Sequence, residues 1–287
     1  MRNAGARGGL WHGVAAPHPL PFPRPVVAVP ARPRRHRVLL VLAAAIAAGA
    51  AVAAAPAAGA SATAIPGHTV VRGDFETGNL NQWSGIARVR TSSVRLVRRP
   101  VRQGRYAARF EVRDGDNPIG YGDRAQIQIG TNEREGQVRW YSWSTRVSRG
   151  FPSYRSFQVL AQWHAKANGS PPLAFFAEGD RLVLKVHRHA GPGALLNIRD
   201  IWRGPLRRGA WRDIKLRVRW SGSDSRGWVE LWIDGRRQRF DDRSRRRRIR
   251  TMYPGVDNYF TMGYYRQSGL SRTGVVFHDG FRMTTGR

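Results

Sequence analysis

The chain has 287 residues, of which 41% are hydrophobic and none is cysteine. That length and apolar content suit one domain with a core large enough to fold unaided, and the lack of cysteine excludes disulfides and thiolate metal sites. Lys and Arg total 49 against 19 Asp and Glu, and the resulting formal charge of +30 favours polyanionic partners: nucleic acid, anionic lipid surfaces or acidic polysaccharide.

The N-terminal segment has the pattern of a targeting sequence. Residues 1–31, rich in Pro, Ala and Gly, are predicted to be disordered or to lie upstream of the true start. Residues 32–62 are predicted to be a signal peptide, because arginines precede an apolar run from Val38 to Val52 and Ala60-Ser61-Ala62 offers a cleavage site. Arg34-Arg35 also permits twin-arginine export. The protein is therefore expected to be secreted; an uncleaved membrane anchor is the alternative.

Residues 68–286 are predicted to form one all-β domain. Apolar and polar stretches alternate there, broken by Gly, Pro, Asn and Asp, and no long segment has a helical period. Strands are expected over residues 124–129, 157–164, 181–188, 214–220, 228–233 and 259–267. Asp234-Gly235 is a strong two-residue hairpin signal. So many strands in one domain indicate a β-sandwich or jelly roll.

Alternation along three of these strands predicts a polar face. In 157–164, the residues Phe157, Val159, Ala161 and Trp163 are expected in the core, opposite Gln158, Leu160, Gln162 and His164. In 124–129, Ala125, Ile127 and Ile129 are expected in the core, opposite Arg124, Gln126 and Gln128. In 259–267, the polar face would hold Tyr259, Thr261, Gly263, Tyr265 and Gln267. Gly263 would leave a gap where a sugar ring approaches the sheet. Amide, guanidinium, imidazole and phenol groups on one face suit a polyhydroxylated, anionic ligand.

Two further clusters have more than one interpretation. Lys185, His187 and His189 share a face by alternation and could extend the polar face. A zinc site at His187 and His189 is an alternative, but no third ligand is identifiable. The arginine run from Arg243 to Arg250 is either a solvated loop or a patch that docks a polyanion.

At these residues the sequence resembles the alginate lyase and heparin lyase I-like group of polysaccharide lyases. Gln162-Trp163-His164 resembles that group's Gln-(Ile/Val)-His, and Tyr259–Gln267 resembles its Tyr-Phe-Lys-Ala-Gly-x-Tyr-x-Gln. Gly122–Gln126 resembles its Gly-Asp-Arg-x-Glu strand. Weaker matches extend the resemblance over about residues 71 to 283. Gln126 replaces the Glu of the group's pattern, and Gln128 and Thr261 stand where alginate lyases have Arg and Lys. The heparin lyase I-like branch therefore fits better, and the polymer is not fixed.

The resemblance implies a concanavalin A-like jelly roll and β-elimination on a uronate polymer. Arg124 and Gln162 would bind the uronate carboxylate, His164 would act as the general base, and Tyr265 would protonate the leaving oxygen or act as base and then acid. The expected substrate-binding residues are Gln126, Gln128, Lys185, His187, Tyr259 and Gln267. No metal or other cofactor is required. The expected partner is an anionic polysaccharide, with no nucleic acid, no membrane unless the signal is uncleaved, and a monomeric protein.

Three other functions are alternatives to a polysaccharide lyase. A non-catalytic lectin-like protein on the same fold is the main alternative. A glycoside hydrolase needs two close carboxylates, and Glu230 with Asp234 is a poor pair because Asp234 suits the hairpin turn. Nucleic-acid binding fits the charge, but no nucleic-acid-binding motif is present.

Overall fold

The computed structural model describes residues 66–167, 169–188 and 197–286. The predicted disordered segment, 1–31, and the predicted signal peptide, 32–62, lie outside the described residues, as does His189. Within the described ranges no helix is long and apolar enough to cross a membrane.

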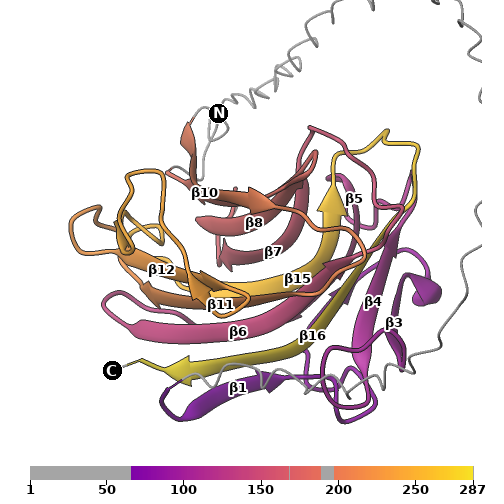
Figure 1. Cartoon of the computed structure of the whole chain (residues 1–287), viewed down its shortest axis with the longest axis horizontal. Helices are drawn as coiled ribbons and strands as arrows, with labels where there is room; N and C mark the ends of the chain where they lie inside the picture. The colour runs from indigo at the N-terminus through magenta and orange to yellow at the C-terminus, as the bar shows by residue number, and fades with distance from the viewer. Residues whose placement is uncertain (1–65, 168, 189–196, 287) are drawn as a thin grey trace, which may run out of the picture. The chain divides into compact units, whose positions relative to one another are not determined.

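Two antiparallel sheets make up the described chain (Figure 1). The larger sheet runs β13-β12-β11-β6-β16-β4-β3, with β1 beside β16 and β14 beside β12. Its strands are β1 (Thr69–Gly73), β3 (Val94–Val97), β4 (Ala107–Val112), β6 (Val138–Val147), β11 (Arg212–Arg219), β12 (Trp228–Ile233), β13 (Arg236–Arg237), β14 (Arg247–Arg248) and β16 (Gly274–Thr285).

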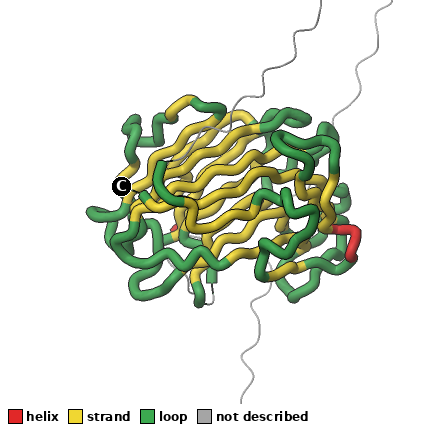
Figure 2. The backbone as a smooth tube through the Cα atoms, turned by 90° about the horizontal axis from the view of Figure 1, so that it is seen from below, coloured by secondary structure: helices red, strands yellow, loops and turns green. Residues whose placement is uncertain are grey.

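The second sheet runs β10-β9-β8-β7-β15-β5-β2. Its strands are β2 (Gly85–Ala87), β5 (Asp123–Ile129), β7 (Gln158–Ala165), β8 (Leu173–Glu178), β9 (Arg181–His187), β10 (Ile198–Pro205) and β15 (Asn258–Arg266). A short 3-10 turn covers Thr91–Ser93 (Figure 2). The predicted all-β jelly-roll sandwich is confirmed.

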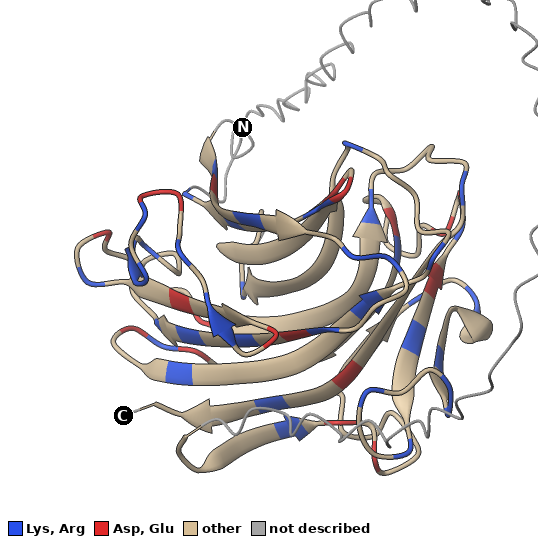
Figure 3. Ribbon diagram, in the orientation of Figure 1, with Lys and Arg blue, Asp and Glu red and all other residues tan. Residues whose placement is uncertain are grey.

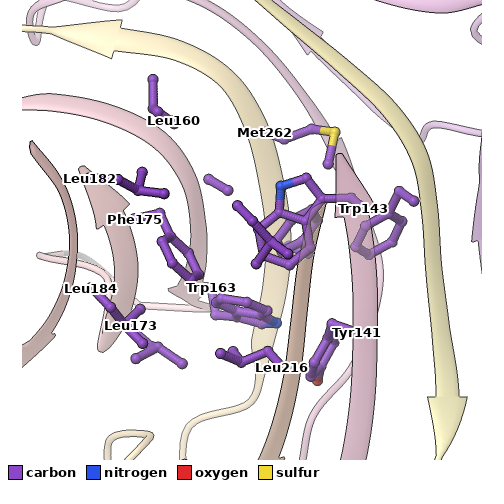
Figure 4. Close-up of a cluster of buried hydrophobic side chains, with 14 of the residues drawn as sticks. Tyr141, Trp143, Leu160, Trp163, Leu173, Phe175, Leu182, Leu184, Leu216 and Met262 are labelled. Carbon is purple, nitrogen blue, oxygen red and sulfur yellow. The ribbon is translucent and has the colours of Figure 1, made fainter. Parts of the chain in front are cut away.

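Aromatic side chains fill the space between the two sheets. Trp163 of β7 lies with its ring centroid 4.9 Å from that of Tyr141 and 6.0 Å from that of Trp143, both on β6 (Figure 4). Phe260 of β15 stacks on Phe281 of β16 at 4.4 Å. These rings are almost fully buried. Burial of large aromatic rings contributes much of the hydrophobic free energy of folding, so this layer fixes which faces of β7 and β15 point outward.

The predicted faces of β7 are only half right. Trp163 and Ala161 lie in the core as expected, and so does Leu160, while Val159 joins an apolar cluster on the outer face with Phe176. The pairing of β7 with β8 shifts register between Val159 and Ala161. This β-bulge adds one residue and reverses the alternation before it. The predicted positions of Phe157, Gln158, Val159 and Leu160 were therefore wrong: Gln158 is buried and accepts a hydrogen bond from the hydroxyl of Tyr264 in the core, and Phe157 packs against the outer cluster. Gln162 and His164, beyond the bulge, keep theirs.

The explanation of Gly263 as a gap for a sugar ring is also wrong. A Cβ atom at this position would lie 2.3 Å from the carbonyl oxygen of Ala125 and 2.9 Å from Cδ1 of Phe110, which belongs to the opposite sheet. The φ angle is +138°. Glycine is required because the backbone conformation and close packing leave no room for a side chain.

Gly263→Ala should therefore lower the free energy of unfolding by about 2 to 4 kcal/mol, from backbone strain plus collision with β5. Gly269→Ala is the matched control, since Gly269 has a φ of +78° but nothing within 4 Å of an added Cβ. It should cost about 1 kcal/mol from strain alone. Urea unfolding of both variants gives the comparison, and equal losses would show that the collision is not real.

Candidate functional site

The outer face of the seven-stranded sheet carries most of the predicted site residues, and we call it the polar face. Its members from β5, β7 and β15 are Arg124, Gln126, Gln128, Gln162, His164, Tyr259, Thr261 and Tyr265. Antiparallel pairing aligns them in rows: His164 lies opposite Tyr259, Thr261 lies between Gln162 and Gln128, and Tyr265 lies opposite Arg124. The structure therefore brings residues that are far apart in sequence onto three adjacent strands.

Backbone hydrogen bonds at Ala165 and Gly169 orient the ring of His164. Its Nδ1 lies 2.8 Å from the carbonyl oxygen of Ala165, and since a carbonyl can only accept, Nδ1 carries the hydrogen and donates it. The lone pair is therefore on Nε2. Burial lowers the pKa of His164 from its usual value of 6.5, and the positive charge of Arg124 lowers it further, against the raising effect of backbone hydrogen bonds. His164 is consequently neutral at neutral pH, as a general base must be.

Tyr259 is the tyrosine beside His164, with ring centroids 5.4 Å apart. Burial raises the pKa of Tyr259, although the charge of Arg124 opposes that rise. Tyr265 lies toward the other end of β15. The sequence did not show which of the two tyrosines neighbours the histidine, because that depends on the register between β7 and β15.

Arg124 lies over the ring of Tyr265, with its guanidinium carbon 3.8 Å from the ring centroid. Its Nη2 donates to the carbonyl oxygen of Tyr121. Burial lowers the pKa of the guanidinium, while Tyr265 and Tyr259 raise it. No carboxylate of the described chain pairs with Arg124. A half-buried cation without an anionic partner is suited to bind an anionic ligand.

Polar atoms near the middle of this face have no hydrogen-bond partner within the described residues. They are Nε2 of Gln126, Oγ1 of Thr261 and Nε of Arg124, all buried. Buried polar groups are normally paired, so unpaired ones mark a place where a ligand or water completes the bonding. These atoms lie on the same face as His164, Gln162 and Tyr265.

The charge of Lys185 is already neutralised. Its Nζ lies 2.7 Å from Oε1 of Glu178 and 2.6 Å from Oδ1 of Asp200, and Arg203 pairs with the same two carboxylates. His187 is on the same face of β9, close to Phe176, and burial lowers its pKa to about 4. Both residues thus lie on the predicted face, but Lys185 offers no unpaired charge there.

Three charged residues at the β8–β10 end of the polar face were not predicted from the sequence, and one predicted residue lies beyond the end of its strand. Asp200 and Arg203 were missed because a register shift in β10 between Asp200 and Trp202 hides their common face, and Glu178 was missed because it lies on a different strand, β8. Gln267 follows the end of β15 and is exposed. In the described ranges no group of three or more His, Asp or Glu side chains is placed to hold a metal ion.

The lowered pKa of His164 predicts the pH dependence of catalysis. A general base acts in its neutral form, so if His164 is that base, kcat/KM should fall only as pH drops through the pKa of His164, which lies below 6.5. The acidic limb of the kcat/KM profile should accordingly have its midpoint below pH 6.5. A midpoint above that value in a protein that cleaves its substrate would show that another group, or an unburied histidine, is titrating.

The fold and the polar face together define a class: a jelly-roll sandwich whose outer sheet face is equipped to bind an acidic carbohydrate. Comparison with known families agrees, because the family described as Polysaccharide lyase matches residues 75–282. The chain belongs to this polysaccharide lyase family and is an enzyme of that class. The resemblance to polysaccharide lyases found in the sequence is confirmed. No curated protein gives a significant match.

Solved structures with this fold include carbohydrate-active enzymes from fungi and a virus. The endo-β-1,4-glucuronan lyase from the fungus Trichoderma reesei aligns with a TM-score of 0.61 and 17% identity, covering 76% of this chain and 96% of that one. Alginate lyase vAL-1 from Chlorella virus aligns at 0.52 and 10%, covering 76% and 100%. A glycoside hydrolase family 131 catalytic domain from Coprinopsis cinerea aligns at 0.54 and 14%, covering 77% and 95%. At such identities these likenesses establish the fold.

Proposed function

We propose that the protein is a secreted lyase that cleaves a uronate-containing polysaccharide by β-elimination on the polar face. The observation that carries the proposal is Arg124, a half-buried guanidinium with no carboxylate partner in the described chain, close enough to lower the pKa of a neutral His164. A uronate carboxylate supplies the missing anion. The C5 proton, on the carbon that bears this carboxylate, is then the one that a neighbouring base can remove.

The reaction assigns a task to each group. Arg124 and Gln162 hold the carboxylate and stabilise the negative charge that spreads onto it as the C5 proton leaves. Nε2 of His164 takes that proton, and the electron pair of the C5–H bond forms the C4–C5 double bond. The bond between C4 and the bridging oxygen breaks, and the hydroxyl of Tyr265 gives its proton to that oxygen. Gln126 and Thr261, with unpaired polar atoms, bind sugar hydroxyls.

The charges of this face favour a polymer with one negative charge per sugar. Lys185 and Arg203 are neutralised by Glu178 and Asp200, which leaves Arg124 as the cation without a partner among the site residues described above. A heavily sulfated chain would need many unpaired cations and would meet two carboxylates at the β8–β10 end of the face. An unsulfated polyuronate is therefore the preferred substrate class.

A substrate panel tests the proposal. Purified protein is incubated with unsulfated polyuronates of different linkage, with sulfated glycosaminoglycans and with a neutral glucan, and the ultraviolet absorbance of the unsaturated uronate product is followed. We expect a rise on at least one unsulfated polyuronate and none on the neutral glucan. Binding to polyuronates without any rise would favour the lectin-like alternative instead. The hydrolase alternative finds no support in Glu230, which lies on the other sheet and pairs with arginines.

A further inference from the structure

The outer face of the larger sheet carries a second set of cations, far in sequence from the catalytic motifs. Pairing of the strands aligns one row across β13, β12, β11, β6, β16 and β1. Its members are Arg237, Trp232, Lys215, Ser142, Arg282 and Arg72, and we call it the cationic row. Figure 3 shows Lys and Arg residues on several strands of this sheet. With neighbouring strands about 4.8 Å apart, the row spans about 24 Å.

Tryptophan rings support the cations at one end of this row. Trp140 and Trp232 lie with ring centroids 5.2 Å apart, and Nζ of Lys215 is 5.7 Å from the first and 4.9 Å from the second. Arg237 lies over Trp232 at 5.5 Å, and Arg246 lies over Trp228 at 4.4 Å. The rings hold these cations by cation–π attraction, and the ammonium group of Lys215 keeps its donors available to a ligand.

The acidic groups on this face do not balance its cations, although Asp213, on the same face of β11 as Lys215, adds a carboxylate that pairs with Arg102. Glu230 is almost fully buried and is shared by Arg217, Arg237 and Arg246, at 3.6, 2.5 and 3.0 Å. At the other end, Asp74 pairs with both Arg72 and Arg282. Lys215 has no carboxylate partner in the described chain, and burial lowers the pKa of its ammonium group. The row therefore has a net positive charge, with an unpaired cation at its centre.

A small hollow adjoins Lys215, lined by Ser142, Ser144, Asp213, Gln103 and Gly235. Hydroxyl and amide groups in such a place are suited to sugar hydroxyls. None of the large exposed hydrophobic side chains of the described chain belongs to the cationic row or to its supporting rings, Trp140, Trp228 and Trp232. A membrane surface, which would be anchored by such side chains, is a poorer fit.

We propose that the cationic row is a second, non-catalytic binding site for an acidic polysaccharide. It lies on the opposite sheet from the polar face, so one long chain or two neighbouring chains can engage both. A second contact raises the effective concentration of polymer at the enzyme without adding to catalysis. The choice of polysaccharide over other polyanions rests on the proposed function of the polar face. Arg246, which lies over Trp228 beside the row, would contribute to this binding, so part of the run from Arg243 to Arg250 would help to bind the polysaccharide.

The test removes charge from the row while keeping side-chain size. The background is the double variant Arg124→Gln/His164→Ala, which disables the polar face, so that the remaining binding reports the second site. The row variant adds Lys215→Gln/Arg282→Gln to this background. Affinity for unsulfated polyglucuronate is measured by calorimetry at low salt. We expect the row variant to bind about threefold to tenfold more weakly than its background, with the difference lost in high salt. Arg95→Gln/Arg149→Gln removes two exposed arginines outside the row and should change little.

Several results would overturn the inference. They are no residual binding in the disabled background, equal affinity of the row variant and its background, and equal weakening in the control variant. A loss confined to anionic vesicles or to double-stranded DNA would also contradict it, because the occupant would then be wrong. With the polar face intact, the row variant should keep its kcat/KM on a short oligosaccharide. Binding is read without turnover, so a protein with no lyase activity could still confirm the site while refuting the proposed function.

Discussion

His164→Ala and Tyr265→Phe are each expected to lower kcat by about 10² to 10⁴, because each removes a group that we propose to move a proton in the elimination. The fold should be unaffected. The hydrogen bonds of His164 go to backbone groups, at Ala165 and Gly169, and the ring of Tyr265, which phenylalanine retains, packs at 5.0 Å from Phe157. Initial rates of product absorbance at saturating polyuronate give kcat, and thermal unfolding confirms folding.

Tyr259→Phe is the matched comparison, since it removes a phenol hydroxyl from the same strand and the same face. We expect mainly a raised KM, because Tyr259 is assigned to substrate binding. The opposite pattern, a large loss of kcat in Tyr259→Phe and near-normal turnover in Tyr265→Phe, would move the proton-transfer role to the tyrosine that neighbours His164. Normal turnover in His164→Ala would refute the whole assignment.

The residues whose side of the sheet the sequence predicted correctly are those on regular strands. Alternation in β5 puts Ala125 and Ile127 in the core and Arg124 and Gln126 on the outer face, as found. The same rule works for β15, and for β7 after its bulge. Strand alternation is a local property of the backbone, so a short segment contains the information needed to predict it.

What the sequence could not show depends on contacts between segments. The bulge at Leu160 follows from how β7 meets β8, and the collision that requires Gly263 involves the opposite sheet. The register that places His164 beside Tyr259 is set by packing of whole strands. The pairing of Lys185 with Glu178 and Asp200 joins three strands, so the alternation of β9 alone suggested a free cation.

Arg124→Gln should lower kcat/KM by about 10² to 10³, the cost of losing one group that stabilises developing negative charge. The physical reason is that glutamine can donate a hydrogen bond to the carboxylate but cannot neutralise it. The same change should raise the pKa of His164, because the charge of Arg124 holds that pKa down. Nuclear magnetic resonance titration of His164 measures this second effect without any turnover.

Stability should change little in Arg124→Gln, within about 1 kcal/mol. The substitution leaves no carboxylate unpaired, and it relieves the desolvation that lowers the pKa of the buried guanidinium; the loss of the contact with the Tyr265 ring offsets part of that gain. Arg181→Gln removes an equal charge from an exposed position on β9 and should retain activity. If both variants lose kcat/KM equally, long-range charge attracts the polymer and Arg124 has no specific role. If only Arg124→Gln loses activity and its His164 pKa rises, one guanidinium serves both the carboxylate and the base.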